Sequence, residues 1–110
     1  MSARELVIPP DAAADPKSVE MIRVWIADGG LHCTLNVGHW TAQKAPIDEN
    51  VAWGIMLSDV IRHVADATRE LTGADPAATA KAIFQSLRNE LAAPSSEASG
   101  GFADPKGDRN

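Results

Sequence analysis

The sequence predicts a two-layer α+β domain, with an antiparallel β-hairpin followed by two amphipathic helices packed on one face. Two observations lead to this class. Residues 20–37 alternate apolar and polar side chains around a glycine pair, and residues 49–92 carry apolar side chains at helical spacing. The chain has 110 residues, of which 45% are hydrophobic and 23% charged, and this composition fits one small domain.

The hairpin is predicted around Gly29 and Gly30, because apolar side chains gather on one face of both flanking strands. That apolar face comprises Ile22, Val24, Ile26, Leu31, Cys33, Leu35 and Val37. A two-residue loop at Gly29-Gly30 pairs Val24 with Leu35. A loop at Asp28-Gly29 shifts the pairs but keeps the faces, so either loop gives an apolar inner face.

The opposite face of the hairpin has a mixed composition, and we expect it to be an interface or ligand surface. Its residues are Met21, Arg23, Trp25, His32, Thr34 and Asn36. With the loop at Gly29-Gly30, Trp25 lies across from Thr34 and Arg23 across from Asn36. Tryptophan, methionine and arginine are enriched at the centres of interfaces. The alternative is that the N-terminal arm or Trp40 covers this face within the chain.

Two helices are predicted, one from Glu49 to Leu71 and one that starts at Pro76. Asp48 and Asp75 are placed to cap their first turns. The apolar stripe of the first helix comprises Trp53, Met56, Leu57, Val60, Ile61, Val64, Ala67 and Leu71, and that of the second Ala80, Ile83, Phe84, Leu87 and Leu91. A glycine inside the first helix, Gly54, suggests close approach to another backbone.

The two ends of the chain are expected to lie outside this domain, which covers residues 20–93. Residues 1–19 form an N-terminal arm in which residues 6–8 are either a short third strand or an extended packed segment, because Pro9 and Pro10 end any strand there. Residues 94–110 are rich in Pro, Gly and Ser and are expected to be a flexible tail.

Charge and cysteine content limit the partners and the compartment. The net charge is -5, and no two basic residues are adjacent, so neither nucleic acid nor an anionic membrane is expected as a partner. No apolar run has the length of a signal peptide or a membrane span. Cys33 is the single cysteine, which agrees with a reducing compartment, and we expect a cytoplasmic protein.

Three histidines are the candidates for chemistry: His32, His39 and His63. Asp59 and Asp66 fall on the same helical side as His63, a spacing that suits a divalent ion, although the same carboxylates also suit surface ion pairs with neighbouring arginines. The HExxH, CxxC, GxGxxG, GxxxxGK[ST] and GxSxG patterns are absent from the sequence. The sequence therefore assigns no catalytic residue, no metal ligand and no cofactor.

Two segments carry a resemblance to a known family. The stretch from Trp25 through LHCTLNVGHW, followed by VAWGIMLSDVIRHVADA, resembles a family of short bacterial proteins known as a domain of unknown function. The similarity covers roughly residues 5–92, and Trp40, Trp53 and Gly54 are its most recognisable residues. It implies a single bacterial cytosolic domain and no particular activity.

A small sheet with two open edges and a short chain with a small core both favour association. The sequence predicts a cytoplasmic homodimer that serves as a protein-interaction or ligand-binding module, with sheets joined edge to edge or through the Trp25 face. The alternative is a small enzyme or metal-binding protein that uses His32, His39 or His63 with nearby carboxylates.

Overall fold

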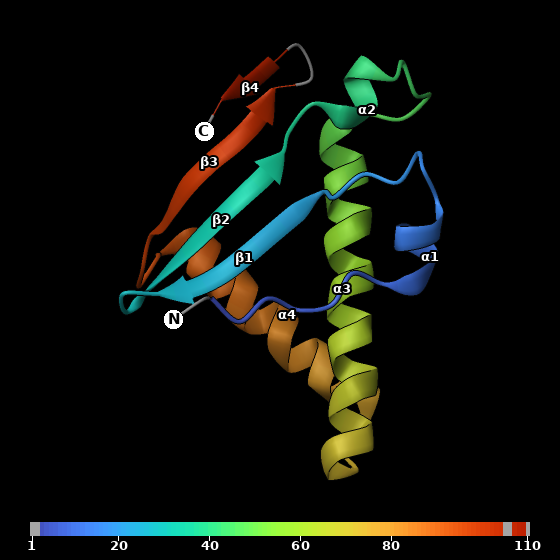
Figure 1. Cartoon of the computed structure of the whole chain (residues 1–110). Helices are drawn as coiled ribbons and strands as arrows, with labels where there is room; N and C mark the ends of the chain where they lie inside the picture. Colours follow the sequence, from blue (N-terminus) through green and yellow to red (C-terminus); the bar gives the residue numbers. More distant parts are fainter. Residues whose placement is uncertain (1–2, 105–106, 110) are drawn as a thin grey trace.

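The computed structural model describes residues 3–104 and 107–109. Along the chain it has α1 (Pro10–Ala14), β1 (Ile22–Ala27), β2 (Gly30–Asn36), α2 (His39–Ala42), α3 (Glu49–Thr72), α4 (Pro76–Ala92), β3 (Ala98–Asp104) and β4 (Gly107–Arg109) (Figure 1). The strand order is β1-β2-β3-β4, with β1 antiparallel and β3 parallel to β2. The predicted α+β class is confirmed.

The hairpin forms, and its loop lies at Asp28-Gly29 rather than at Gly29-Gly30. Both loop residues have positive φ, 49° and 72°, as a type I′ turn requires, and Asp and Gly tolerate that conformation. Trp25 therefore lies opposite His32, and Arg23 lies opposite Thr34. A loop at Gly29-Gly30 would instead place each of them opposite the residue two positions later in β2. The two faces are as predicted, because the shift is an even number of residues.

Strand β3 lies in the segment that was expected to be a flexible tail. It pairs in parallel with β2, and Cys33 is the partner of Gly100. The backbones approach so closely there that a Cβ on Gly100, whose φ is 127°, would overlap the carbonyl of Cys33. The sequence ASGGFAD has no alternation of large apolar side chains, so backbone pairing defines this strand.

Residues 6–8 of the N-terminal arm do not form a strand. Residues 3–9 have no regular secondary structure, and Leu6, Val7 and Ile8 are exposed. The helix α1 follows directly, with Pro10 in its first turn, where a missing N–H removes no helical hydrogen bond. The third-strand alternative for residues 6–8 is therefore wrong.

Both long helices begin at the predicted caps, and α3 extends one residue beyond the predicted end at Leu71. Asp48 accepts hydrogen bonds from the amides of Asn50 and Val51, and Asp75 accepts one from Ala78. Gly73 ends α3 with a φ of 80°. A Cβ on Gly54 would meet no atom within 4 Å, so the close approach expected at this glycine is absent.

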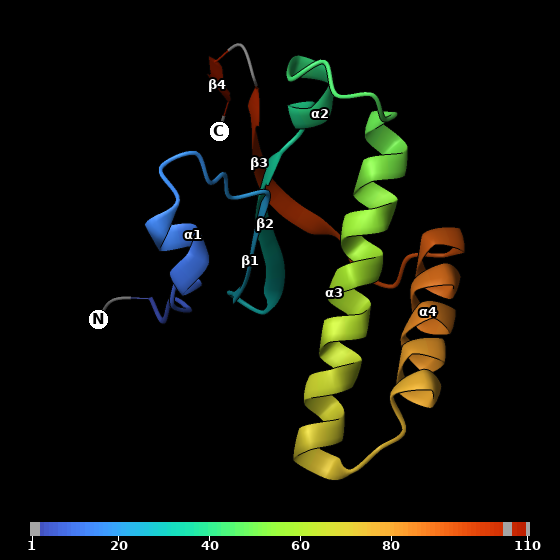
Figure 2. The same ribbon diagram turned by 90° about the vertical axis from the view of Figure 1, so that its right-hand side faces the viewer.

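The two helices lie on one side of the sheet, and the arm with α1 lies on the other (Figure 2). Among the described residues, α3 packs mainly on α4 and α2 rather than on the strands. Ala52 and Ala65 are the buried apolar residues there, at 4% and 2% exposure. The helix stripes are therefore not buried in a core against the sheet of the same chain.

Candidate functional site

The mixed face of the hairpin is partly covered by the N-terminal arm. The guanidinium of Arg23 forms ion pairs with Glu20, at 3.2 Å, and with Glu5 from the arm. These two carboxylates raise the pKa of Arg23, Glu20 by the larger amount. A groove of about 600 Å³ runs between residues 4–9 of the arm and β1, and Trp25 is one of its lining residues. The structure therefore places the N-terminal arm over part of the mixed face, as one of the alternatives from the sequence expected.

The six residues of this mixed face do not form one open patch. Thr34 is exposed, while Met21, Arg23, Trp25, His32 and Asn36 are half-buried. The amide of Asn36 donates to the carbonyl of Met21 at 2.9 Å, which ties the open end of the hairpin together. The face remains a predicted interface or ligand surface, with the arm along part of it.

His32 connects the hairpin to β3. Its Nε2 lies 3.2 Å from the carbonyl oxygen of Ala27, and its Nδ1 lies 2.8 Å from the hydroxyl of Ser99. Since a carbonyl only accepts, Nε2 carries the proton, and Nδ1 accepts from Ser99 in the neutral ring. A nucleophilic serine needs such a base, but neither residue lines either of the two described cavities. The pair fits a role in holding β3 on β2.

Sequence reasoning missed Ser99 because it lies in the segment expected to be flexible. A hydroxyl beside a histidine 67 positions away in the chain leaves no local spacing signal.

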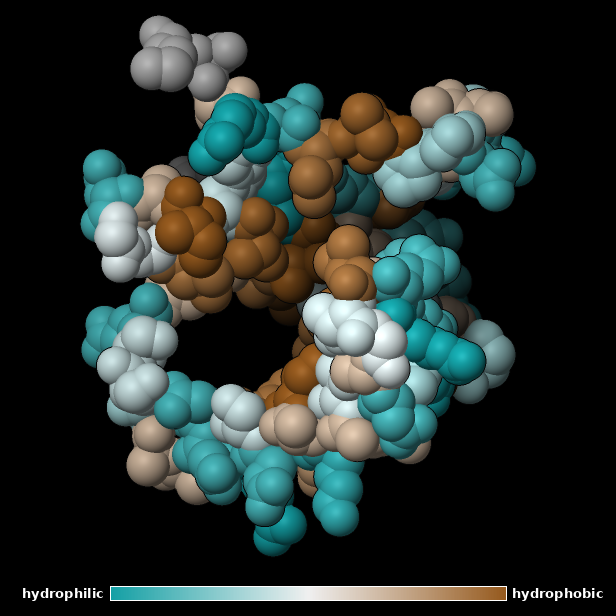
Figure 3. All heavy atoms as spheres, turned by 90° about the horizontal axis from the view of Figure 1, so that it is seen from below, coloured by the Kyte–Doolittle hydropathy of each residue, from teal (hydrophilic) through white to brown (hydrophobic). Residues whose placement is uncertain are grey.

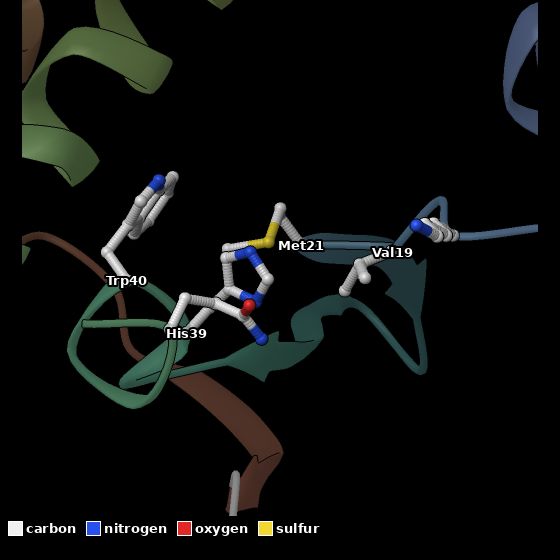
Figure 4. A pocket seen from close by; sticks show the side chains of 6 residues that line it. Val19, Met21, His39 and Trp40 are labelled. Carbon is white, nitrogen blue, oxygen red and sulfur yellow. The ribbon is translucent and has the colours of Figure 1, made fainter. Parts of the chain in front are cut away.

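A second cavity, of about 550 Å³, lies between α2 and the segment that precedes β1. It is lined by Lys17, Val19, Met21, His39, Trp40 and Gln43. Figure 4 shows the ring of His39 beside the Met21 side chain, with Trp40 at the side nearer the helices. The lining offers an aromatic ring, one ammonium group and no carboxylate, so it could hold a small apolar or anionic group but has no acid and base pair.

Glu49 organises the junction between α2 and α3. One carboxylate oxygen accepts from the Gly38 amide and the Trp53 indole, both at 2.9 Å, and the other accepts from the Thr41 amide at 3.0 Å. Desolvation of Glu49 acts to raise its pKa, but the hydrogen bonds from Thr41, Trp53 and Gly38 outweigh it and lower the pKa. The sequence placed Glu49 at a helix start and missed its contacts with α2.

Edge-to-face aromatic contacts reinforce this junction. The Trp40 and Trp53 ring centroids are 6.0 Å apart at an interplanar angle of 81°, and His39 contacts Trp40 in the same way at 5.5 Å. The two tryptophans therefore serve packing between α2 and α3.

The three histidines lie on three different elements, β2, α2 and α3. Asp59 forms an ion pair with Arg62, the surface pairing that the sequence offered as the alternative to a metal site. In the part of the chain that the structure describes, no group of three His, Cys, Asp or Glu side chains could hold a metal ion. His63 is exposed.

The most extensive feature of the described surface is apolar. Large hydrophobic side chains that are more than one third exposed occur on the arm, both long helices and three strands. On α3 they are Val51, Ile55, Leu57, Val60, Val64 and Leu71, and on α4 they are Phe84, Leu87 and Leu91. Figure 3 shows a hollow in the molecule, with apolar side chains along part of its rim and hydrophilic or intermediate ones along the rest.

This fold and surface can be compared with known proteins. The family model described as a domain of unknown function (DUF5076) matches residues 5–95. The chain belongs to the DUF5076 family. This confirms the resemblance noted in the sequence, and it brings no activity with it. No curated protein matches the chain.

A solved structure from a photosynthetic bacterium shares the fold of this DUF5076 chain. It is titled as a candidate pyruvate dehydrogenase from Rhodopseudomonas palustrus CGA009, is 21% identical, and superposes with a TM-score of 0.64. The match covers 89% of this chain and 93% of the other. Identity at this level shows the fold alone.

Within the described residues, no helix combines the length and the apolar character that crossing a membrane requires.

Proposed function

We propose that this DUF5076 protein acts as a homodimeric interaction module, whose folded core is completed by a second copy of the chain. The observation that carries the proposal is the extent of its surface. The accessible area is 9078 Å², whereas a compact monomer of 11.6 kDa exposes roughly 5,800 Å². The surplus is roughly 3,000 Å² per chain, or roughly 6,000 Å² for two chains, and large obligate dimer interfaces bury a total area of this order.

The shape of the chain supports the same proposal. Its radius of gyration is 15.9 Å, against about 13 Å for a compact domain of this length. The arm, β3 with β4, and the helices that stand apart from the sheet all extend the molecule (Figure 2). Large apolar side chains of the strands and helices are exposed to water in the single chain, which is costly, and a second protein surface would relieve that cost.

The arrangement of the polar groups favours a binding module over an enzyme. The histidines do not converge, and neither described cavity combines a histidine with a carboxylate. The groove beside Trp25 and the cavity beside Trp40 are the places where a further protein or small ligand would bind the dimer.

The proposal is tested by measuring the molar mass of the full chain by light scattering at micromolar concentration. We expect twice 11.6 kDa. A mass of one chain across the micromolar range, in a sample that is folded by circular dichroism, would exclude the homodimer.

A further inference from the structure

Two exposed apolar seams on the α3–α4 pair show how a second copy would bind. We propose that the α3–α4 pairs of two chains pack together through these seams and form a four-helix bundle. This inference rests on the proposed homodimer and names its contact surface.

The seam on α3 has the spacing of a coiled coil. It consists of Trp53, Leu57, Val60, Val64, Ala67 and Leu71, which are separated by alternating steps of four and three residues. That repeat keeps the side chains on one side of a helix over its whole length. Leu57, Val60, Val64 and Leu71 are 38%, 47%, 44% and 86% exposed, so the chain itself leaves most of this seam uncovered.

The seam on α4 follows the same rule. Ala80, Phe84, Leu87 and Leu91 are separated by steps of four, three and four residues. Phe84, Leu87 and Leu91 are 56%, 36% and 78% exposed. Both helices of the pair thus carry a heptad-spaced apolar seam that is left largely open to solvent.

The contact between α3 and α4 uses other positions of α3. Ala65, the buried residue in the half of α3 that lies beside α4, follows Val64 directly and so points about 100° away from it around the helix. Ile61, half-buried, lies one turn before Ala65 on the same side. One side of α3 therefore packs on α4 while the neighbouring side presents the seam, as each helix of a four-helix bundle requires.

The charged residues of α3 complete the pattern. Asp59 and Arg62 form an ion pair, and Asp66 and Arg69 occupy the same two heptad positions one repeat later. In a helical bundle these positions lie far from the apolar seam and are exposed to solvent. These four charged side chains therefore lie where a bundle leaves the helix exposed. Ile55 shares the heptad position of Arg62 and Arg69, which makes it a matched control for Val60.

The test compares Val60→Glu with Ile55→Glu in the full chain. The two side chains have similar exposure in the single chain, 47% and 52%, so the changes differ mainly in whether the site lies on the seam. We expect the wild type and Ile55→Glu to have the mass of two chains, and Val60→Glu to have the mass of one chain or to unfold, since a carboxylate buried in the bundle is strongly unfavourable.

A labelling experiment separates loss of the bundle from a general failure to fold. In a Cys33→Ala background, Val60→Cys and Ile55→Cys are each treated with a water-soluble maleimide. A second copy on the seam would make the thiol of Val60→Cys react at least about tenfold more slowly than that of Ile55→Cys, because it reacts only when the dimer opens. If no second copy covers the seam, the two thiols should react with the maleimide at similar rates, because positions 60 and 55 have similar exposure in the single chain.

The outcomes distinguish the two proposals. A wild-type protein that is monomeric contradicts the homodimer and the bundle together. A wild-type dimer in which Val60→Glu is also dimeric, or in which the two cysteine variants react equally fast, contradicts the bundle alone and leaves dimerisation through another surface.

Discussion

The carboxylate of Glu49 accepts a hydrogen bond from the indole N–H of Trp53, one turn further along α3, at 2.9 Å. The same carboxylate accepts from the amides of Gly38 and Thr41, which bracket the start of α2. One side chain thus joins the end of the sheet, the short helix and the long helix. Because α2 has only four residues, we infer that its position depends on this carboxylate.

Replacing Glu49 with alanine should therefore loosen α2. Two amides and the Trp53 indole would lose their acceptor, and the aromatic contact between Trp40 and Trp53 would lose its alignment. We expect a melting temperature lower by several degrees and a shift of tryptophan fluorescence toward longer wavelength. Glu70→Ala, at an exposed position of α3, is the control and should change neither value. Equal melting temperatures for the two variants would contradict this role.

The pH dependence follows from the lowered pKa of Glu49. A carboxyl whose pKa is lower in the folded than in the unfolded state stabilises the fold above its unfolded value of about 4.3, and that contribution is lost as the pH falls through the folded value. We expect the melting temperature to drop as the pH falls below about 4. The drop should be smaller in Glu49→Gln, which does not titrate; an identical acid profile would argue against the hydrogen bonds to Glu49.

The type I′ turn predicts how the hairpin responds to substitution. Gly29 has a φ of 72°, so Gly29→Ala should cost about 1–2 kcal/mol, because a Cβ strains that conformation. Asp28→Asn should cost little, since Asn adopts positive φ as readily as Asp. Urea unfolding of both variants checks this. A cost for Asp28→Asn that matched that of Gly29→Ala would indicate a different turn.

The pairing of β3 with β2 depends on Gly100. Gly100→Ala would place a methyl group against the Cys33 carbonyl, so we expect β3 to detach from β2. Amide hydrogen exchange should then speed up across residues 98–102, while the β1–β2 amides keep their protection. Unchanged protection of residues 98–102 would mean that this segment pairs elsewhere.

The hairpin and the helix caps could be predicted from the sequence because they depend on neighbouring residues. The alternation at Val24 and its neighbours fixed the faces, but not which two residues make the loop, since Asp28-Gly29 and Gly29-Gly30 give the same parity. The partners of Asp48 and Asp75 lie two or three residues away, so their caps leave a clear local signal.

The long-range features could not be predicted in the same way. Pairing of Gly100 with Cys33 uses backbone groups that every sequence carries. The contact between Ser99 and His32 joins distant residues of ordinary type. The spacing around Val60 identifies an apolar side of a helix but does not tell whether the covering surface belongs to the same chain.

The central claim is that folding of this chain is completed by a second copy, and unfolding at several protein concentrations tests it most directly. For a dimer that unfolds to separate chains, each tenfold rise in concentration stabilises the folded state by about 1.4 kcal/mol of dimer. We expect a melting temperature that rises steadily between about 1 and 100 μM, because unfolding to separate chains is opposed by mass action at higher concentration. A melting temperature that stays constant over this range, for a protein with the mass of one chain, would contradict it.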